Sequence, residues 1–167
     1  DLLLTQQRFA YLRTGGSSTQ DWHIPVQIRI ETKDKAEHRR VLLTGHQTRI
    51  PLPSDVRQVL INEGGHGFYR VQYDARLLQR LLDAGLDRLA PTERFNLLSD
   101  AWATTLSGAM PLADYLQLTR HFTQERDKNV WALLLDSLSF LNRIIAADER
   151  PSLEAFVRTL VAPAVRE

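Results

Sequence analysis

Histidines are the first residues to consider, because two of them on one face of a helix can hold a zinc ion. Such a site needs histidines four residues apart, often with a glutamate beside the first to act as a general base. No two histidines in this 167-residue chain have that spacing, and His-Glu-x-x-His does not occur. We therefore expect each one to be solvated or hydrogen-bonded, although the spacing leaves open a site assembled from distant histidines. The five are His23, His38, His46, His66 and His121.

Nucleophile and phosphate-binding motifs are the next candidates for chemistry. The chain contains no Gly-x-Ser-x-Gly elbow and no cysteine, which removes thiol catalysis, disulfides and Cys-ligated zinc. The cluster Gly64-Gly65-His66-Gly67 lies between two runs of β-type alternation. A phosphate loop leads instead from a strand into a helix and usually ends in Lys followed by Ser or Thr. We interpret the cluster as a hairpin turn that needs positive φ angles.

Carboxylates could serve as general acids or bases. Asp83 and Asp87 lie four residues apart, which is typical of a solvated helix face. Asp100 lies among apolar residues, so we expect it to be half-buried and paired with an arginine, as a structural tie and not as a base. Three tryptophans are interpreted as core anchors, although the first could also line a groove. We assign no catalytic, cofactor-binding or metal-binding residue. The tryptophans are Trp22, Trp102 and Trp131.

Composition and charge exclude several classes of protein. Hydrophobic residues make up 43% of the chain and charged residues 25%, as in ordinary globular domains. The 21 Lys and Arg against 20 Asp and Glu give a net charge of +1, without the basic excess of nucleic-acid binders. No apolar stretch approaches the roughly 18 residues that span a bilayer. The absence of cysteine fits a reducing compartment, so we expect a cytoplasmic protein.

The elements that would position these residues divide the chain in two. Up to residue 73 apolar residues alternate with polar ones, which is typical of half-buried strands. The clearest run is Ile24 to Ile30, and turn-forming residues such as 14–18 separate the runs. Six or seven short strands without a helix long enough for a crossover predict an antiparallel β-sandwich over residues 1–73 and no α/β crossover units. Shorter alternating runs lie near Val41 and Leu43, Ile50 and Leu52, Val59 and Ile61, and Tyr69, Val71 and Tyr73.

From Asp74 onward the apolar spacing becomes helical. Asp74 is a good N-cap, and prolines at 91, 111 and 151 are placed to open three further helices. The longest and most apolar helix is expected from about Asn129 to Ala147, and Pro163 should discourage continuation of the last. We therefore predict an all-β sandwich followed by an all-α helical array. The two small domains, 1–73 and 74–167, would meet with almost no linker.

Five segments, in order along the chain, resemble the zinc aminopeptidases of the M1 family, of the aminopeptidase N type. The most specific contains Gly67-Phe68-Tyr69-Arg70-Val71 and ends in Tyr73-Asp74, like the family sequence that closes its small β-sandwich domain. Another departs mildly from the family, with Glu93 where the pattern has Asp. The segments are Leu4–Phe9, Trp22–Val26, Asn62–Asp74, Glu93–Ala101 and Asp127–Trp131.

The resemblance implies a piece of a peptidase that lacks its catalytic centre. Residues 1–73 would be the β-sandwich domain. Residues 74–167 would be the first part of the helical domain, of the ERAP1-like C-terminal type, which is longer in the family, so we expect truncation. The family's zinc-binding His-Glu-x-x-His, its Gly-x-Met-Glu-Asn segment and its transition-state tyrosine lie in another domain and are absent here. We thus expect Zn²⁺ in the parent enzyme only and an inactive isolated chain.

Two functions follow as hypotheses. In the first, the parent removes N-terminal residues from peptides, and this segment supplies a spacer and part of the helical lid. Its partners would be the catalytic domain of the parent and the parent's peptide substrates. In the second, the chain is a stand-alone protein-binding module without enzyme activity. For the strongest motif we expect Phe68, Tyr69 and Tyr73 at the junction of the two domains, and Arg70 bound to a carboxylate or carbonyls.

Overall fold

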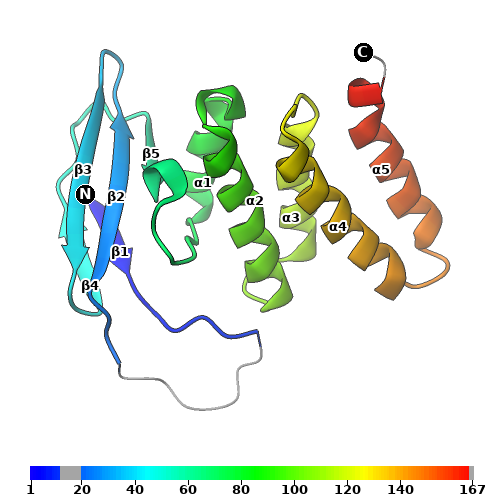
Figure 1. The fold of residues 1–167 in the computed structure, drawn as a ribbon, viewed down its shortest axis with the longest axis horizontal. Helices are drawn as coiled ribbons and strands as arrows, with labels where there is room; N and C mark the ends of the chain where they lie inside the picture. Colours follow the sequence, from blue (N-terminus) through cyan, green and yellow to red (C-terminus); the bar gives the residue numbers. More distant parts are fainter. Residues whose placement is uncertain (12–19, 166–167) are drawn as a thin grey trace. The chain divides into compact units, whose positions relative to one another are not determined.

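A computed structural model of the chain describes residues 1–11 and 20–165 (Figure 1). The turn expected at residues 14–18 lies outside the described residues. The chain divides into two compact units, Asp1–Glu93 and Arg94–Glu167. None of the described helices is both long and apolar enough to cross a membrane.

The first unit contains two small antiparallel sheets. One has three strands in the order β3-β2-β5, and the other pairs β1 with β4. In the larger sheet, Ile28 lies opposite Arg39 on one side and Ile61 on the other. Figure 1 shows β2 and β3 as the two long neighbouring strands. The strands are β1 (Leu2–Thr5), β2 (Ile24–Glu31), β3 (Ala36–Leu43), β4 (Gln47–Ile50) and β5 (Gln58–Ile61).

One apolar core is shared by both sheets. The alternation of β2 turns Val26, Ile28 and Ile30 inward, and the last two are 0% exposed. Leu2 and Ile50 join the same cluster from the smaller sheet. The period-two pattern therefore selected the buried face of β2 correctly, because successive side chains of a strand point to opposite faces.

The predicted all-β sandwich over residues 1–73 is wrong. The described residues form only five strands, in sheets of two and three, and not a full sandwich of six or seven. After β4, Pro51 and Pro53 lack the N–H groups that would extend the strand to Leu52. Burial of residues 69–73 does alternate, but this segment is not a strand. Among the described residues it belongs to neither of the two sheets, and the Tyr73 hydroxyl accepts a hydrogen bond from the Ile61 N–H at 2.9 Å.

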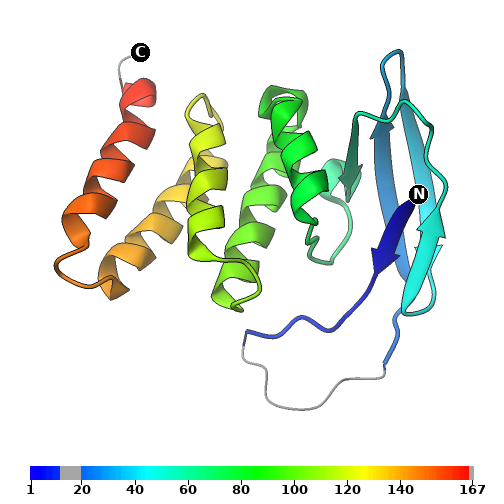
Figure 2. The ribbon, with the colours of Figure 1, turned by 180° about the vertical axis from the view of Figure 1, so that it is seen from behind.

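Helix α1 (Ala75–Asp83) completes the first unit beside β5, as both ribbon views show (Figures 1 and 2). Its predicted N-cap is confirmed, because the Leu77 N–H donates to the Asp74 carboxylate at 2.8 Å. Leu81 is 0% exposed. Two short 3₁₀ turns, η1 (Glu63–Gly65) and η2 (Leu86–Arg88), flank the helix along the chain.

The second unit is helical. The helix that leads into it begins at Pro91, within the first unit, and Pro111 is the N-cap of the next helix, near the predicted starts. The last helix continues to Val165 through Pro163, where the missing N–H removes only one bond in the final turn. The interior is formed by Leu98, Tyr115, Phe122, Val130 and Leu134, each no more than 1% exposed. The elements are α2 (Pro91–Leu106), α3 (Leu112–Thr119), η3 (Arg120–Phe122), α4 (Lys128–Ile144) and α5 (Arg150–Val165).

Candidate functional site

The histidines do not assemble a metal site. All five are exposed. Across residues 1–11 and 20–165, no three His, Asp or Glu side chains come together in a way that could hold a metal ion. His38 instead places its Nδ1 at 2.8 Å from a Glu63 carboxylate oxygen. These residues do not fit a zinc site, and we derive no metal-dependent step from them. That the chain binds no metal stays a prediction.

The glycine cluster forms a tight turn with positive φ angles, as predicted. Asn62, Gly64 and Gly65 have φ angles of 63°, 72° and 73°. The Asn62 side chain closes the turn by accepting from the Gly67 N–H at 2.7 Å and donating to the Gly67 carbonyl at 3.1 Å. The turn is not a hairpin between two strands, because β5 precedes it and no strand follows before α1.

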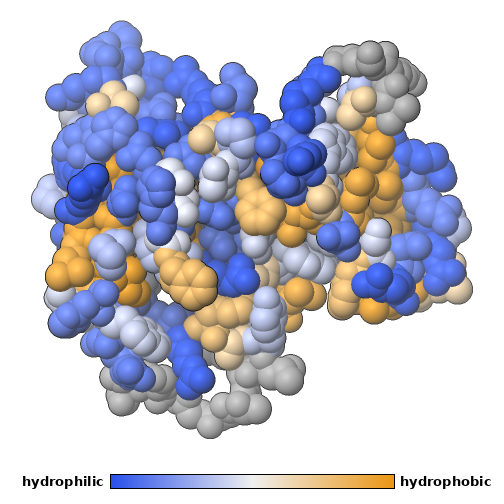
Figure 3. Space-filling view, viewed as in Figure 1, coloured by the Kyte–Doolittle hydropathy of each residue, from blue (hydrophilic) through white to orange (hydrophobic). Residues whose placement is uncertain are grey.

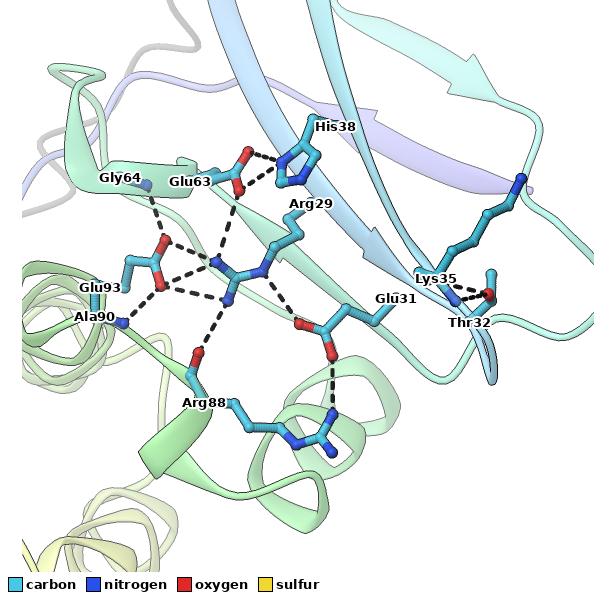
Figure 4. Close-up of polar contacts among 10 residues, drawn as sticks. All are labelled: Arg29, Glu31, Thr32, Lys35, His38, Glu63, Gly64, Arg88, Ala90 and Glu93. Atoms are coloured by element: carbon cyan, nitrogen blue, oxygen red, sulfur yellow. Dashed lines mark hydrogen bonds and ion pairs between the residues drawn. The ribbon is translucent and has the colours of Figure 1, made fainter.

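Arg29 lies at the centre of a network of charges in the first unit (Figure 4). From β2 its guanidinium reaches Glu93 at 3.2 Å, Glu31 at 3.2 Å and Glu63 at 3.6 Å. Arg88 of η2 binds the second oxygen of Glu31 at 3.2 Å. We call Arg29, Glu31, Glu63, Arg88 and Glu93 the Arg29 network. It joins β2, the 3₁₀ turns η1 and η2, and the first turn of α2.

Glu93 is the buried carboxylate of this network, with 4% of the residue exposed. It is the third residue of α2 and accepts from the Ala90 N–H at 2.9 Å, which satisfies a free donor at the helix start. Its other oxygen accepts from the Gly64 N–H at 2.9 Å. Both oxygens also receive Arg29 hydrogen bonds. A carboxylate engaged in this way holds backbone in place and is not set up to abstract a proton.

A second buried ion pair lies in the helical unit. Arg94 donates two hydrogen bonds to the Glu125 carboxylate, from Nε at 2.6 Å and from Nη2 at 2.8 Å. The N–H groups of Arg126 and Asp127 each donate to Glu125 at 2.8 Å. Burial favours the protonated acid, but the Arg94 hydrogen bond and the two amides together hold the Glu125 pKa below 4.5. Glu125 thus shapes the loop that leads to α4.

The other singled-out residues have structural surroundings. Asp83 accepts from Gln79 at 2.7 Å on an exposed face of α1. Asp100 is 8% exposed. Its expected pairing with an arginine stays a prediction. The ring of Trp102 lies 5.0 Å from that of Tyr115, and the Trp131 indole donates to the Glu125 carbonyl at 3.0 Å.

Tyr115 supplies a buried hydroxyl in the second unit. It donates to the Ser137 Oγ at 2.6 Å, and Ser137 donates onward to the Leu134 carbonyl at 2.7 Å. Burial raises the Tyr115 pKa to about 12, against the smaller opposing effect of the Ser137 hydrogen bond. A neutral, hydrogen-bonded phenol of this kind is a core contact.

We expect Tyr115→Phe to destabilise the protein by about 1 kcal/mol, the usual net value of one buried hydrogen bond. The stabilisation linked to the raised pKa of Tyr115 is fully present below pH 10, the ordinary pKa of a tyrosine. It is lost as the pH rises through about 12, the pKa in the folded state. Urea unfolding at pH 7 and at pH 11 measures both effects. Tyr11, which is 51% exposed, provides the control Tyr11→Phe, with no comparable loss at pH 7. Equal losses for the two variants would contradict the prediction.

An open groove of about 500 Å³ runs between α4 and α5. Leu138, Leu153 and Val157 line it together with arginine, asparagine and glutamate side chains. Figure 3 shows apolar surface over this last helix. The groove contains no pair of groups arranged for acid–base or nucleophilic chemistry.

Sequence reasoning missed the Arg29 network. Arg29 and Glu93 are 64 residues apart, and Arg29 reads as an outward polar residue of an alternating strand. The available signal was Glu93 itself, an acid two residues after the helix-opening Pro91, which is typical of a capping position.

Comparisons with known proteins show to which family this chain belongs. Residues 58–167, about two thirds of the chain, match the model of the ERAP1-like C-terminal domain. The chain belongs to this family. Membership in the ERAP1-like family confirms the resemblance to M1 aminopeptidases predicted from the motifs. The match begins at β5, so it includes the glycine turn and all five α-helices.

Individual relatives carry aminopeptidase names. The chain is 25% identical over 171 residues to Aminopeptidase 2 of Candida albicans, covering 100% of this chain and 18% of the relative. It is 26% identical to Aminopeptidase A of Gloydius brevicauda, covering 98% and 18%. It is 25% identical to a puromycin-sensitive aminopeptidase of Caenorhabditis elegans, covering 83% and 15%. The chain therefore spans less than a fifth of the length of these curated relatives.

Proposed function

We propose that this chain is a non-catalytic segment of a zinc-dependent metalloaminopeptidase that removes N-terminal residues from peptides. The observation that carries the proposal is the family match over residues 58–167, together with aminopeptidase relatives aligned along nearly the whole chain. The parent would bind Zn²⁺ and peptides through residues outside this segment. A metal-bound water and a glutamate base would supply the chemistry there.

The segment would act as a structural spacer and as the first part of a helical lid. The Arg29 network supports this role, because it fixes the start of α2 to the sheet of the first unit. The Arg94–Glu125 pair supports it too, because it fixes the loop before α4. Such a support affects catalysis indirectly, through the shape of the chamber and the exclusion of water. The rest of the parent chain would be its main partner.

Two further proposals concern organisation and location. We place the functional boundary between spacer and lid at residues 73 and 74, where alternating burial gives way to the Asp74-capped helix. We also propose a cytoplasmic parent, from the absence of cysteine. Cell fractionation of the parent tests the second point.

The test begins with the reading frame upstream of Asp1. Several hundred codons that include His-Glu-x-x-His are expected, whereas a start codon within a few residues would support the stand-alone binding module instead.

The purified parent should then release p-nitroaniline from aminoacyl-p-nitroanilides, lose this activity with a chelator and regain it with Zn²⁺. The isolated 167-residue chain should release no p-nitroaniline, with or without added Zn²⁺, and should bind no stoichiometric zinc. Metal-dependent turnover by the chain alone would overturn the proposal.

A further inference from the structure

Phe68 is fully exposed in a segment whose other residues are held in place. Its relative exposure is 108%, as in an extended peptide. The sequence places it at the junction of the two domains, which stays a prediction, and the structure shows that its ring is not buried. Its neighbour Tyr69 packs against the apolar core, and Tyr73 binds the backbone of Ile61. A large apolar ring held entirely in solvent needs a physical explanation.

The backbone that presents this ring is well fixed. Asn62 is 4% exposed, adopts a left-handed conformation and holds both polar backbone groups of Gly67, the residue before Phe68. Gly64 donates to the buried Glu93, which anchors the turn to the Arg29 network. Because the backbone is already ordered, seating the ring in a pocket would cost little further conformational entropy.

Arg70, two residues after Phe68, is also exposed. Its guanidinium carbon lies 5.1 Å from the centre of the Phe9 ring, and Phe9 meets Tyr11 edge-on at 5.0 Å. Phe9 and Tyr11 are 38% and 51% exposed. Aromatic residues and arginine are the types enriched where protein surfaces meet, and a few such anchors dominate the binding energy.

We propose that Phe68 is an anchor that inserts into an apolar pocket on the part of the parent chain outside residues 1–167. This rests on the proposed function only in making the chain a segment of a longer protein. The turn lies within the family match, and the aligned relatives have more than four fifths of their length outside the matched segment. One ring is small against the roughly 1,200 Å² of a stable interface between separate proteins. A covalently tethered partner needs far less contact, because its effective concentration is high.

A photo-crosslinker tests the proposal. Benzoylphenylalanine replaces Phe68 in the full-length parent, and in a matched control it replaces Leu42 of β3, which is 56% exposed. After irradiation, peptide mass spectrometry locates the crosslinked partner. The expected result is an adduct within one chain between position 68 and a peptide outside residues 1–167, at least tenfold more abundant than from position 42.

Every other result overturns the proposal. These are adducts within residues 1–167, adducts to a second chain seen as a doubled mass, equal adducts from both positions, or no adduct from position 68. Circular dichroism of the labelled chain should match the unlabelled one, because an exposed ring contributes no packing. The aminopeptidase assay is read separately. A parent with the adduct but no peptidase activity would defeat the proposed function alone, and an active parent without the adduct would defeat the anchor alone.

Discussion

Replacing Glu93 by glutamine is expected to destabilise the protein by about 3 kcal/mol, because it leaves Arg29 without its buried counter-charge. The amide would keep the shape of the side chain, but its NH₂ group would face N–H donors where an acceptor is required. The N–H groups of Gly64 and Ala90, which donate to Glu93, should lose protection from hydrogen exchange. Chemical denaturation measures the global loss, and amide exchange by NMR measures the local one.

The matched control is the exposed ion pair of α5. Arg158 and Glu154 lie 3.8 Å apart and are 70% and 51% exposed, so Arg158→Gln should cost no more than about 0.5 kcal/mol. The double variant of Glu93→Gln with Arg29→Met should lose less than the sum of the single variants, because neither charge is then left alone. Strict additivity, or equal losses in the buried and the exposed pair, would show that the Arg29 network does not support the fold.

Glu125→Gln is the second large effect, with an expected loss of about 3 kcal/mol at pH 7. The variant loses the two-pronged contact with Arg94 and weakens the acceptor of the Arg126 and Asp127 amides. The Trp131 indole, which donates to the Glu125 carbonyl, should report the change by fluorescence.

The stability that Glu125 contributes should depend on pH in a definite direction. The Glu125 pKa is lowered in the folded state, so its contribution is complete above the ordinary value of 4.5 and is lost as the pH falls through the folded value. The gap in stability between wild type and Glu125→Gln should therefore narrow when urea unfolding at pH 7 is compared with unfolding near pH 3. A gap that stays constant would mean that the charge of Glu125 does not carry the stabilisation.

Helix starts were predictable because their signals are local. Asp74 and Asp127 accept from the first-turn amides of α1 and α4, and proline needs no partner at the start of α2. Pro163 was less informative, because a proline in the last turn removes only one hydrogen bond and the helix ran on to Val165.

Sheet completion and the charge network were less predictable because both depend on distant partners. The alternation of Tyr69 and Tyr73 correctly indicated which side chains turn inward, but a strand also depends on a partner strand from elsewhere in the chain, which alternation alone does not reveal. In the same way, nothing near Arg29 in the sequence announces Glu93. Only the folded chain brings the two within 3.2 Å.

Glu93 and Arg94 are consecutive residues of α2, and each serves a different buried pair. Successive residues of a helix are rotated by about 100° around its axis. Deleting or inserting one residue in this turn would therefore swing one of these side chains away from its partner. Insertions and deletions in this turn should therefore be far less tolerated in evolution than substitutions, because the one-residue spacing of Glu93 and Arg94 is needed to keep both ion pairs.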